Sequence, residues 1–516
     1  MEFEAVIGLE VHAELSTKSK MFCSCPVVDS TQAEPNVAVC PVCGGMPGVL
    51  PVINEQAVAY GIKVALALEC QVANTSIFAR KNYFYPDLPK GYQISQYEYP
   101  LAEHGRLRIQ TSQSERDIRI RRVHLEEDTG KLTHVDPRPG EVAAQGNQAD
   151  PADIGNVAGS GAKSEGYSLV DLNRAGVPLL EIVSEPDMHT LEEVRAYSEG
   201  LRAILRYLGV NSGDMEKGVI RFEANVSVRP AGSQVLGTRV EIKNLNSFRA
   251  LERATAYQIE QQIAQIQAGK AIAQETLGWD DARAVTYSQR SKEEAHDYRY
   301  FPEPDLPPLV VEQDWIERIA ATLPELPFAR ARRFMQQYEL SLADANLLAS
   351  DRLVADYFEA TATFACADNR GDGAVPPRMV ANWITGEIFS WLNLSGHTIQ
   401  EVRVPPAGLA ELLRLAKRDI NLNTAKNVLS EMLETGKTAP QIIQERGLKQ
   451  ISDAGFIAGL VQTVLQDHPQ ELASYLAGKE TLSNWFYGQV MRAAKGQANP
   501  PVLRSELERQ LAERKK

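Results

Sequence analysis

Apolar and polar residues alternate over several short stretches in the first 300 residues, with the period of two that is typical of β-strands. These stretches are Phe3–His12, Asp117–Leu125, Tyr167–Leu172, Val219–Val228 and Thr238–Lys243. Successive side chains of a strand point to opposite faces of its sheet. We therefore expect a sheet with one apolar face and one polar face.

Two segments in the same half repeat their apolar residues with the period of a helix. The first, Thr190–Leu208, begins with a threonine, carries Glu193 at the spacing of a capping box, and is followed by Gly209. The second is Ser247–Gln267. Strands and helices follow one another without a regular strand–helix–strand rhythm, so the pattern predicts an α+β fold.

Two groups of prolines divide the chain. Four prolines lie between residues 302 and 308, and Pro405 and Pro406 form a weaker break. Neither a helix nor a central strand tolerates such a cluster, because proline lacks the backbone N–H. We predict a mixed N-terminal domain at 1–300, a helical domain at 301–404 and a helical tail domain at 405–516. A chain of 516 residues is long enough for about three domains.

The helical tail contains residues that are typical of the ends of helices. Asn423 and Ser452 are expected to begin helices, whereas Gly436 and Gly447 are expected to end them. The stretch 139–166, rich in small and polar residues, is expected to be a loop.

The distribution of charge limits the function classes. The net charge is −13, which argues against a chain built throughout to bind nucleic acid. Residues 407–516, however, hold 15 basic and 12 acidic residues, so this tail could approach a polyanion. No run approaches the roughly 20 apolar residues of a membrane helix. The N-terminus has the pattern of a strand rather than a signal peptide, so the expected location is the cytoplasm, or an organelle after cleavage of a targeting segment.

Four of the six cysteines lie within 21 residues, which indicates metal binding rather than a disulfide framework. They are Cys23, Cys25, Cys40 and Cys43, and the second pair is followed by two glycines. Two close thiolate pairs with a glycine turn suit tetrahedral zinc, here a closed structural site. The alternative is four free thiols in an apolar corner. The remaining cysteines, Cys70 and Cys366, are expected in the core.

The polar faces of the expected strands carry an excess of carboxylates. Glu10 and His12 alternate with Leu9 and Val11 and therefore point together to the polar side. The same alternation places Arg221, Glu223, Asn225, Glu241 and Lys243 on polar faces, and two further segments add Glu126, Glu127 and Glu181. Each acid alone fits a solvated sheet face. Together they would repel one another unless a cation lay among them.

Magnesium is the natural cation for such a group, because it prefers oxygen ligands and bridges carboxylates to nucleotide phosphates. Lys90, Arg174 and Lys243 are candidates to balance phosphate charge, although each alone also fits an ordinary solvated cation. The sequence contains no phosphate-binding G-x-x-x-x-G-K-[ST] loop and no dinucleotide fingerprint. ATP, if used, must therefore be held by a sheet and metal ions.

Several long motifs resemble one known family. They are IGLEVH from residue 7, CPVCGG from 40, YFYPDLPKGYQISQY from 83, HLEEDTGKL from 124, LNRAGVPLLEIVSEPD from 172, EANVSVRP from 223, EIKNLNSFR from 241 and RSKEEAHDYRYFPEPDLPPL from 290. These stretches resemble the GatB family, the B subunits of the aspartyl/glutamyl-tRNA amidotransferases. The resemblance implies a cradle-shaped N-terminal domain related in fold to glutamine synthetase. It also implies a helical domain and a tail domain that hold tRNA.

The resemblance also implies a reaction. Members of this family use ATP to phosphorylate the side-chain carboxylate of Glu-tRNA(Gln), and in many organisms of Asp-tRNA(Asn). An amidase, the A subunit, supplies ammonia from glutamine to displace the phosphate, and the small C subunit clamps the two in a heterotrimer. Two alternatives are a non-catalytic scaffold that holds tRNA and partner, and a stand-alone glutamate kinase or ligase. The clustered acids disfavour the first, and the long helical tail disfavours the second.

Carried onto this chain, the resemblance implies roles for particular residues. The candidates for catalysis with ATP and magnesium are Glu10, His12, Glu126, Glu127, Glu181, Glu223 and Glu241, and all of these except Glu126 are candidate magnesium ligands. Zinc falls to the four clustered cysteines. The candidate ATP contacts are the cations already named for phosphate charge, Lys90, Arg174 and Lys243. One departure concerns Glu223, since many relatives have aspartate at this position. The longer side chain keeps the charge but moves it by one methylene.

Overall fold

The computed structural model describes residues 2–135, 167–290, 299–367, 374–448, 453–494 and 498–515. The chain divides into two compact units, Met1–Phe328 and Ala329–Lys516. In the first, strands and helices are combined, whereas the described part of the second contains helices. The predicted α+β class is therefore confirmed. The predicted loop 139–166 and the predicted cap Ser452 lie outside the described residues. The predicted division at 300 and 404 stays a prediction.

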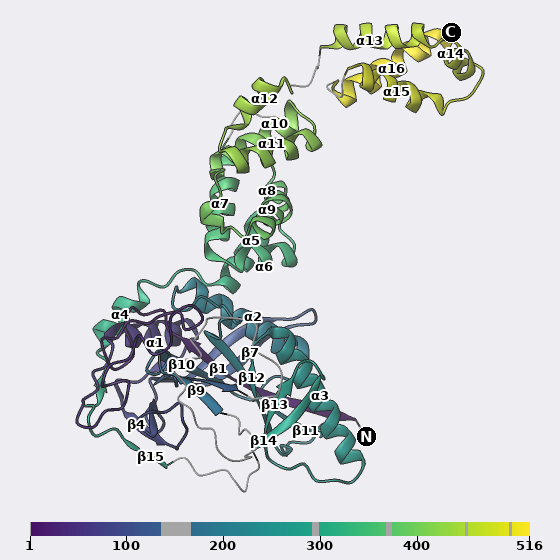
Figure 1. Cartoon of the computed structure of the whole chain (residues 1–516). Coiled ribbons are helices and arrows are strands. Elements are labelled where there is room, and N and C mark those ends of the chain that lie inside the picture. Colours follow the sequence, from purple (N-terminus) through teal and green to yellow (C-terminus); the bar gives the residue numbers. More distant parts are fainter. Residues whose placement is uncertain are drawn as a thin grey trace, which may run out of the picture. The chain divides into compact units, whose positions relative to one another are not determined.

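A nine-stranded sheet forms the centre of the first unit, in the order β14-β13-β12-β11-β1-β10-β7-β6-β2. Its strands are β1 (Phe3–Glu14), β2 (Gln71–Val72), β6 (Ala102–Gln110), β7 (Glu115–Glu127), β10 (Pro178–Ser184), β11 (Ile220–Pro230), β12 (Val240–Leu245), β13 (Thr276–Asp280) and β14 (Val285–Arg290). Neighbours are antiparallel except for β12 and β13, which are parallel. Figure 1 labels most of these strands.

The register of the central strands brings polar residues side by side. β1 lies between β10 and β11, so that His12 is opposite Glu181 on one side and Glu10 is opposite Glu223 on the other. On the next strand, β7, His124 is opposite Glu181. Directly opposed residues of antiparallel strands project to the same face. The polar face of the sheet therefore collects these side chains in one place.

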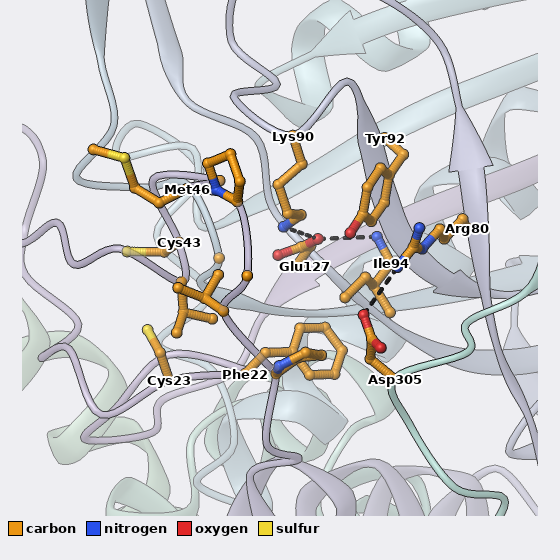
Figure 2. Close-up of a pocket in the computed structure, with 17 residues that line it drawn as sticks. Phe22, Cys23, Cys43, Met46, Arg80, Lys90, Tyr92, Ile94, Glu127 and Asp305 are labelled. Atoms are coloured by element: carbon orange, nitrogen blue, oxygen red, sulfur yellow. Dashed lines mark hydrogen bonds and ion pairs between the residues drawn. The ribbon is translucent and has the colours of Figure 1, made fainter.

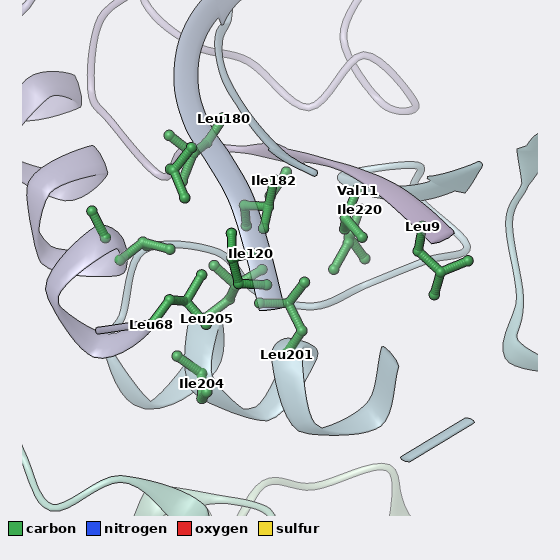
Figure 3. Close-up of a cluster of buried hydrophobic side chains, with 14 of the residues drawn as sticks. Leu9, Val11, Leu68, Ile120, Leu180, Ile182, Leu201, Ile204, Leu205 and Ile220 are labelled. Carbon is green, nitrogen blue, oxygen red and sulfur yellow. The ribbon is translucent and has the colours of Figure 1, made fainter. Parts of the chain in front are cut away.

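The apolar face of the sheet packs against three helices, α1 (Glu55–Ala67), α2 (Leu191–Tyr207) and α3 (Phe248–Gln267). Leu9 and Val11 on β1 are fully buried there, as the alternation predicts. Figure 3 shows Ile120, Ile182 and their neighbours on the strands packed against Leu201 and others from α2. Burial of each such side chain stabilises the fold by roughly 1.5–3 kcal/mol. This core holds the sheet in place beneath its charged face.

The ends of the two predicted helices of this unit are confirmed. The Thr190 hydroxyl accepts a hydrogen bond from the Glu193 backbone N–H, and the Glu193 carboxylate accepts one from the Thr190 backbone N–H, which completes the capping box. Gly209 follows α2 with φ of 68°. Ser247 caps α3 through a hydrogen bond from the Ala250 N–H.

The proline-rich segment belongs to the edges of small sheets in the first unit. β15 (Arg299–Pro302) is the edge strand of a three-stranded sheet with β4 (Phe78–Asn82) and β5 (Tyr92–Gln96). β16 (Leu309–Val310) pairs with β3 (Thr75–Ser76), and β8 (Lys131–Val135) pairs with β9 (Tyr167–Asp171). Helix α4 (Gln313–Ala320) follows. Edge positions accommodate proline because no partner needs its missing N–H.

The second unit has two apolar clusters, one formed from residues 331–443 and the other from residues 457–511. Its α-helices are α5 (Pro327–Tyr338), α6 (Leu342–Ala349), α7 (Arg352–Cys366), α8 (Pro377–Trp383), α9 (Phe389–Ser395), α10 (Pro406–Arg418), α11 (Leu422–Thr435), α12 (Ala439–Arg446), α13 (Ala454–Asp467), α14 (Pro469–Leu476), α15 (Leu482–Ala493) and α16 (Pro500–Lys515). Across the described ranges, no helix has the length and apolar character needed to cross a membrane.

Two details of the helical region correct the sequence-based expectations. The cap of α11 is Asn421, whose side chain accepts a hydrogen bond from the Thr424 N–H at 2.8 Å, whereas Asn423 lies in the first turn. Two asparagines two residues apart give the same local signal, so the pattern alone could not choose between them. Cys70 is buried as expected, but Cys366 is exposed at the end of α7. The predicted glycine caps at 436 and 447 are confirmed, and both have the left-handed conformation.

Candidate functional site

Six side chains on the polar face of the sheet form two adjoining groups of potential metal ligands. The first group comprises His12, Glu126 and Glu181, and the second comprises Glu10, Glu223 and Glu241. Within each group the ligand atoms all lie within 4.8 Å of one another. Five neighbouring strands, β7, β10, β1, β11 and β12, contribute them. The two groups adjoin through β1, which supplies Glu10 to one and His12 to the other.

In the first group, the Glu181 carboxylate lies between the imidazole of His12 and that of His124, a neighbour outside the group. Glu181 Oε2 lies 3.4 Å from His12 Nε2 and 3.2 Å from His124 Nε2, and Glu126 Oε1 lies 3.7 Å from His12 Nε2. Burial opposes a charge on His12, but the hydrogen bond and charge of Glu181 raise its pKa to about 9. Burial also opposes ionisation of Glu181, yet the adjacent His124 and His12 hold its pKa well below the usual range. Glu181 is therefore a buried, ionised carboxylate.

The second group carries more negative charge than its neighbours balance. Lys243 Nζ lies 3.0 Å from Glu223 Oε2 and 3.3 Å from Glu241 Oε1, whereas Glu10 receives only a hydrogen bond from Asn225 at 2.9 Å among the described contacts. Lys243 lowers the pKa of Glu223 in spite of burial. Burial and the charges of Glu181 and Glu223 raise the pKa of Glu10. A cation bound at this group would relieve the repulsion.

A cavity of about 400 Å³ opens beside these groups. His12, Glu126 and Glu223 line it, together with the cationic side chains of Lys81, Arg174, Arg221 and Lys243. Lys81 is half-buried. Burial opposes its charge, but the charge of Glu126 raises its pKa. Acids and cations thus face the same space, which suits a ligand that carries both metal ions and phosphate groups.

One wall of this cavity is an ionic network centred on Asp128. Its Oδ2 accepts a hydrogen bond from Arg221 at 2.9 Å and lies 3.6 Å from Arg174 Nε. Arg174 also donates to the carbonyls of Thr129 and Gly130. Burial opposes ionisation of Asp128, but the two guanidinium groups lower its pKa to about 2. The network fixes both arginines at the cavity wall.

Glu127 and Lys90 lie apart from the acid groups. Consecutive strand residues project to opposite sides, so Glu127 points away from Glu126. Its Oε1 lies 2.5 Å from Lys90 Nζ and accepts a hydrogen bond from the Ile94 backbone N–H at 2.9 Å. Both residues line a second cavity of about 230 Å³ beside the cysteine segment, shown in Figure 2. The structure therefore does not bring these two predicted site residues together with the others.

The four clustered cysteines converge although they belong to two loops. Their sulfur atoms lie within 4.8 Å of one another, and Cys43 Sγ is 3.8 Å from Cys40 Sγ and 3.9 Å from Cys25 Sγ. Tetrahedral zinc with Zn–S bonds of about 2.3 Å would place its sulfur ligands about 3.8 Å apart. The residues therefore fit a zinc ion. Gly45 closes the turn in the left-handed conformation, with φ of 73°.

The electrostatics of this cluster favour a thiolate. A hydrogen bond from the Cys23 thiol, together with the nearby Lys20 ammonium, lowers the pKa of Cys43 to about 4. The same interaction raises the pKa of Cys23. The thiolate is the form that binds metals.

Sequence reasoning missed three charged residues that the fold brings to these sites. His124 was visible two positions before Glu126 in a strand, and this spacing alone indicates a shared face. Lys81 and Lys20 gave no comparable signal. Lys81 lies on the five-residue strand β4, and Lys20 is in a loop whose path follows from distant contacts.

Comparisons with known proteins agree with the motifs. A family model described as the GatB/GatE catalytic domain matches residues 5–317, and one described as the GatB domain matches residues 357–511. The chain is similar to the B subunits of the aspartyl/glutamyl-tRNA(Asn/Gln) amidotransferases of Thermodesulfovibrio yellowstonii (50% identity over 98% of each chain) and Moorella thermoacetica (51% identity over 99% of this chain and 100% of the relative). It is also 48% identical to that of Myxococcus xanthus over 99% of each chain. The chain therefore belongs to the GatB family of amidotransferase subunits.

Proposed function

We propose that this chain is the ATP-dependent kinase component of a tRNA-dependent amidotransferase. Its substrate is the side-chain carboxylate of Glu-tRNA(Gln), and of Asp-tRNA(Asn) where that species occurs. The names of the relatives support this assignment of substrate class. The partners are an amidase, which is the A subunit, and the small C subunit, in a heterotrimer located in the cytoplasm.

One observation carries the proposal, namely the two acid groups beside a cavity that also exposes four cationic side chains. A carboxylate does not react with ammonia until one of its oxygens becomes a good leaving group. Phosphorylation supplies that leaving group. Bringing a polyphosphate to a carboxylate requires compensation of negative charge on both reactants, which this arrangement of metal ligands and cations provides.

The reaction has two steps. In the first, a side-chain carboxylate oxygen attacks the γ-phosphorus of ATP, and the bond to the β,γ-bridging oxygen breaks with release of ADP. In the second, ammonia attacks the acyl carbon, inorganic phosphate leaves with the C–O bonding pair, and an amide remains after loss of a proton. Magnesium, when bound by Glu10, His12, Glu181, Glu223 and Glu241, would neutralise phosphate charge during the transfer.

The cationic residues of the cavity have a distinct part in this proposal. Arg174, held against the carbonyls of Thr129 and Gly130, and Lys243, held by Glu223, face the space where phosphate oxygens would lie. They would orient the phosphates for in-line attack. Glu127 and Lys90, which the sequence groups with these residues, line the neighbouring cavity instead. Their part in the reaction therefore remains a prediction.

The cysteine cluster is proposed as a closed structural zinc site. Four sulfur ligands complete a tetrahedral zinc and leave no position for a reacting molecule. Zinc at this point would hold the loops of residues 20–45 together beside the sheet.

The proposal can be tested with the heterotrimer, Glu-tRNA(Gln), γ-labelled ATP and magnesium. We expect phosphate release to depend on the aminoacylated tRNA. Glu181→Gln, which removes the charge between the two histidines, should lower this release about 100-fold. Glu185→Gln is the matched control, because Glu185 lies four residues later and pairs with Arg121 outside the cavity.

The outcomes separate this proposal from its alternatives. A scaffold role would leave phosphate release unchanged in Glu181→Gln while the isolated amidase retained the whole reaction. Phosphorylation of free glutamate without tRNA would establish a stand-alone kinase instead. Equal loss in both variants would show that the effect of Glu181→Gln is not specific to the site.

A further inference from the structure

A lysine is completely enclosed beside the cysteine cluster. Lys20 has no exposed surface, and its Nζ donates to the carbonyls of Ala38 at 2.7 Å and Leu172 at 3.3 Å. The same nitrogen lies 3.6 Å from Cys43 Sγ. None of the carboxylates in the described ranges forms an ion pair with it. Its environment is thus two carbonyl dipoles and one sulfur atom.

Such an ammonium group needs a counter-ion. Burying an unpaired charge is costly, and carbonyl dipoles compensate only part of the loss of hydration. Four thiolates around a divalent zinc ion leave a net charge of −2, which is unfavourable where the cluster is buried, at Cys43. A lysine ammonium in contact with one of these sulfur atoms offsets both costs. The ammonium and the metal-bound cluster therefore carry opposite charges and are in contact through Cys43.

The lysine also connects the cluster to the wall of the acidic cavity. Its acceptor Leu172 begins a turn that carries Arg174 and ends at Gly176. Gly176 lies directly against Cys43 and Lys20, since an added Cβ would stand 3.3 Å from Cys43 Cβ and 3.5 Å from Lys20 Cδ. The Gly176 N–H donates to the Asp128 carbonyl at 2.9 Å, and its carbonyl accepts from the Met21 N–H at 2.7 Å.

We propose that Lys20 is the counter-ion of the metal-bound cysteine cluster and that it fastens this cluster to the turn that positions Arg174. Lys20 is a positioning residue, because it acts on the metal through Cys43 and on the cavity through Leu172. This inference rests on the proposed zinc site. It adds a second consequence of metal binding, namely order in the turn 172–176 beside the site of phosphoryl transfer.

The test is a thermodynamic cycle with Lys20→Met, which keeps the length and apolar stem of the side chain but removes its charge. The zinc affinity of the purified heterotrimer is measured by competition with a chromophoric chelator. We expect the affinity to fall 10- to 100-fold, the range seen when an outer partner of a metal ligand is removed. Zinc should raise the melting temperature of the parent protein more than that of the variant. Without zinc the two proteins should differ less in stability, because Lys20 then faces only the Cys43 thiolate and not the metal-bound cluster.

The control is Lys18→Met, which makes the same chemical change at an exposed position two residues earlier. It should leave the zinc affinity unchanged. Hydrogen exchange in residues 172–176 should increase in Lys20→Met with zinc present, but not in Lys18→Met. A mere packing role predicts lower stability of Lys20→Met with or without zinc and an unchanged affinity, and this result would overturn the inference. If the parent protein itself binds no zinc, the proposed metal site fails as well, so the two failures are distinguishable.

Discussion

The acid groups and the cysteine cluster are both candidate metal sites, but they are built in different ways. The acids project from five hydrogen-bonded strands whose register is fixed by the buried core on the opposite face. The cysteines lie in two loops that are held by turns, by Lys20 and by a few contacts with residues 170–176. In the first site the scaffold imposes the geometry of the ligands. In the second, a bound metal ion would itself contribute to the geometry.

This difference has an energetic meaning. The sheet holds like charges together, and burial together with the charges of Glu181 and Glu223 raises the pKa of Glu10. Burial of Leu9, Val11 and Ile182 on the other face offsets the cost. A site of this kind is preorganised, because its ligand side chains are in place before the ligand binds, and catalysis depends on such preorganisation. A loop site of the proposed structural kind needs no such preorganisation, because binding of the ion would itself order the loops.

The largest expected effect comes from removing a ligand of the loop site. Cys43→Ser should abolish stoichiometric zinc binding, because Cys43 is the central sulfur of the cluster and the one beside Lys20. Structural zinc contributes its binding energy to local folding. Hydrogen exchange measured by mass spectrometry should therefore increase by orders of magnitude in residues 18–52 of the variant. Strands β1, β10 and β11 should stay protected.

Cys70→Ser is the control for that experiment. Cys70 is a buried thiol far from the cluster in the chain, and it is not one of the four grouped sulfurs. Its replacement should leave zinc content at the parental value. If Cys43→Ser instead exposes the sheet strands as strongly as the loops, the two sites are not independent and the comparison is wrong.

A smaller effect is expected from two adjacent acids that belong to different sides of β7. Glu126→Gln should lower tRNA-dependent phosphate release about 100-fold. It should lower the free energy of unfolding less than Glu127→Gln does, because Lys81 and His12 keep Glu181 as a second carboxylate. Glu127→Gln should lower the free energy of unfolding by about 3 kcal/mol, because it leaves Lys90 without its buried counter-charge. Phosphate release and urea unfolding should be measured on both variants, to compare the loss of activity with the loss of stability in each.

The informative result is that one variant mainly loses phosphate release whereas the other mainly loses stability. If both variants lose activity equally with parental stability, Glu127 acts with the acid groups despite its position in the second cavity. That outcome would support the sequence-based grouping of Glu127 with the magnesium candidates.

The polar residues that face the sheet site were largely predictable, because period-two alternation within one strand shows which side chains point away from the core. Glu10 and His12 alternate with residues that could only be core, and the same holds for Glu223 and Glu241. Which strands are neighbours is not encoded in alternation. The order β7-β10-β1-β11-β12 follows from the register, and only this order divides the acids into two groups.

The limits of prediction have physical causes. Glu126 and Glu127 are both buried acids in one motif, and composition treats them alike, whereas the strand sends them to opposite sides. The closeness of Cys40 and Cys43 was predictable from spacing alone, since the turn Cys40–Gly45 is local. The enclosure of Lys20 was not, because its partners Ala38 and Leu172 lie 18 and 152 residues away in the sequence.

The smallest expected effect sharpens the view that the sheet imposes its geometry. Glu223→Asp restores the residue that the family resemblance implies and withdraws the carboxylate by about 1.5 Å, the length of one carbon–carbon bond. The position opposite Glu10 is fixed by the register, so the charge stays in the same group. We therefore expect phosphate release to remain within about tenfold of the parent, with a few-fold change in the magnesium concentration that gives half-maximal rate. Glu223→Gln, which keeps the length but removes the charge, should lose about 100-fold. If the aspartate variant is as inactive as the glutamine variant, the length of this side chain matters as much as its charge, and the strands alone do not set the geometry of the site.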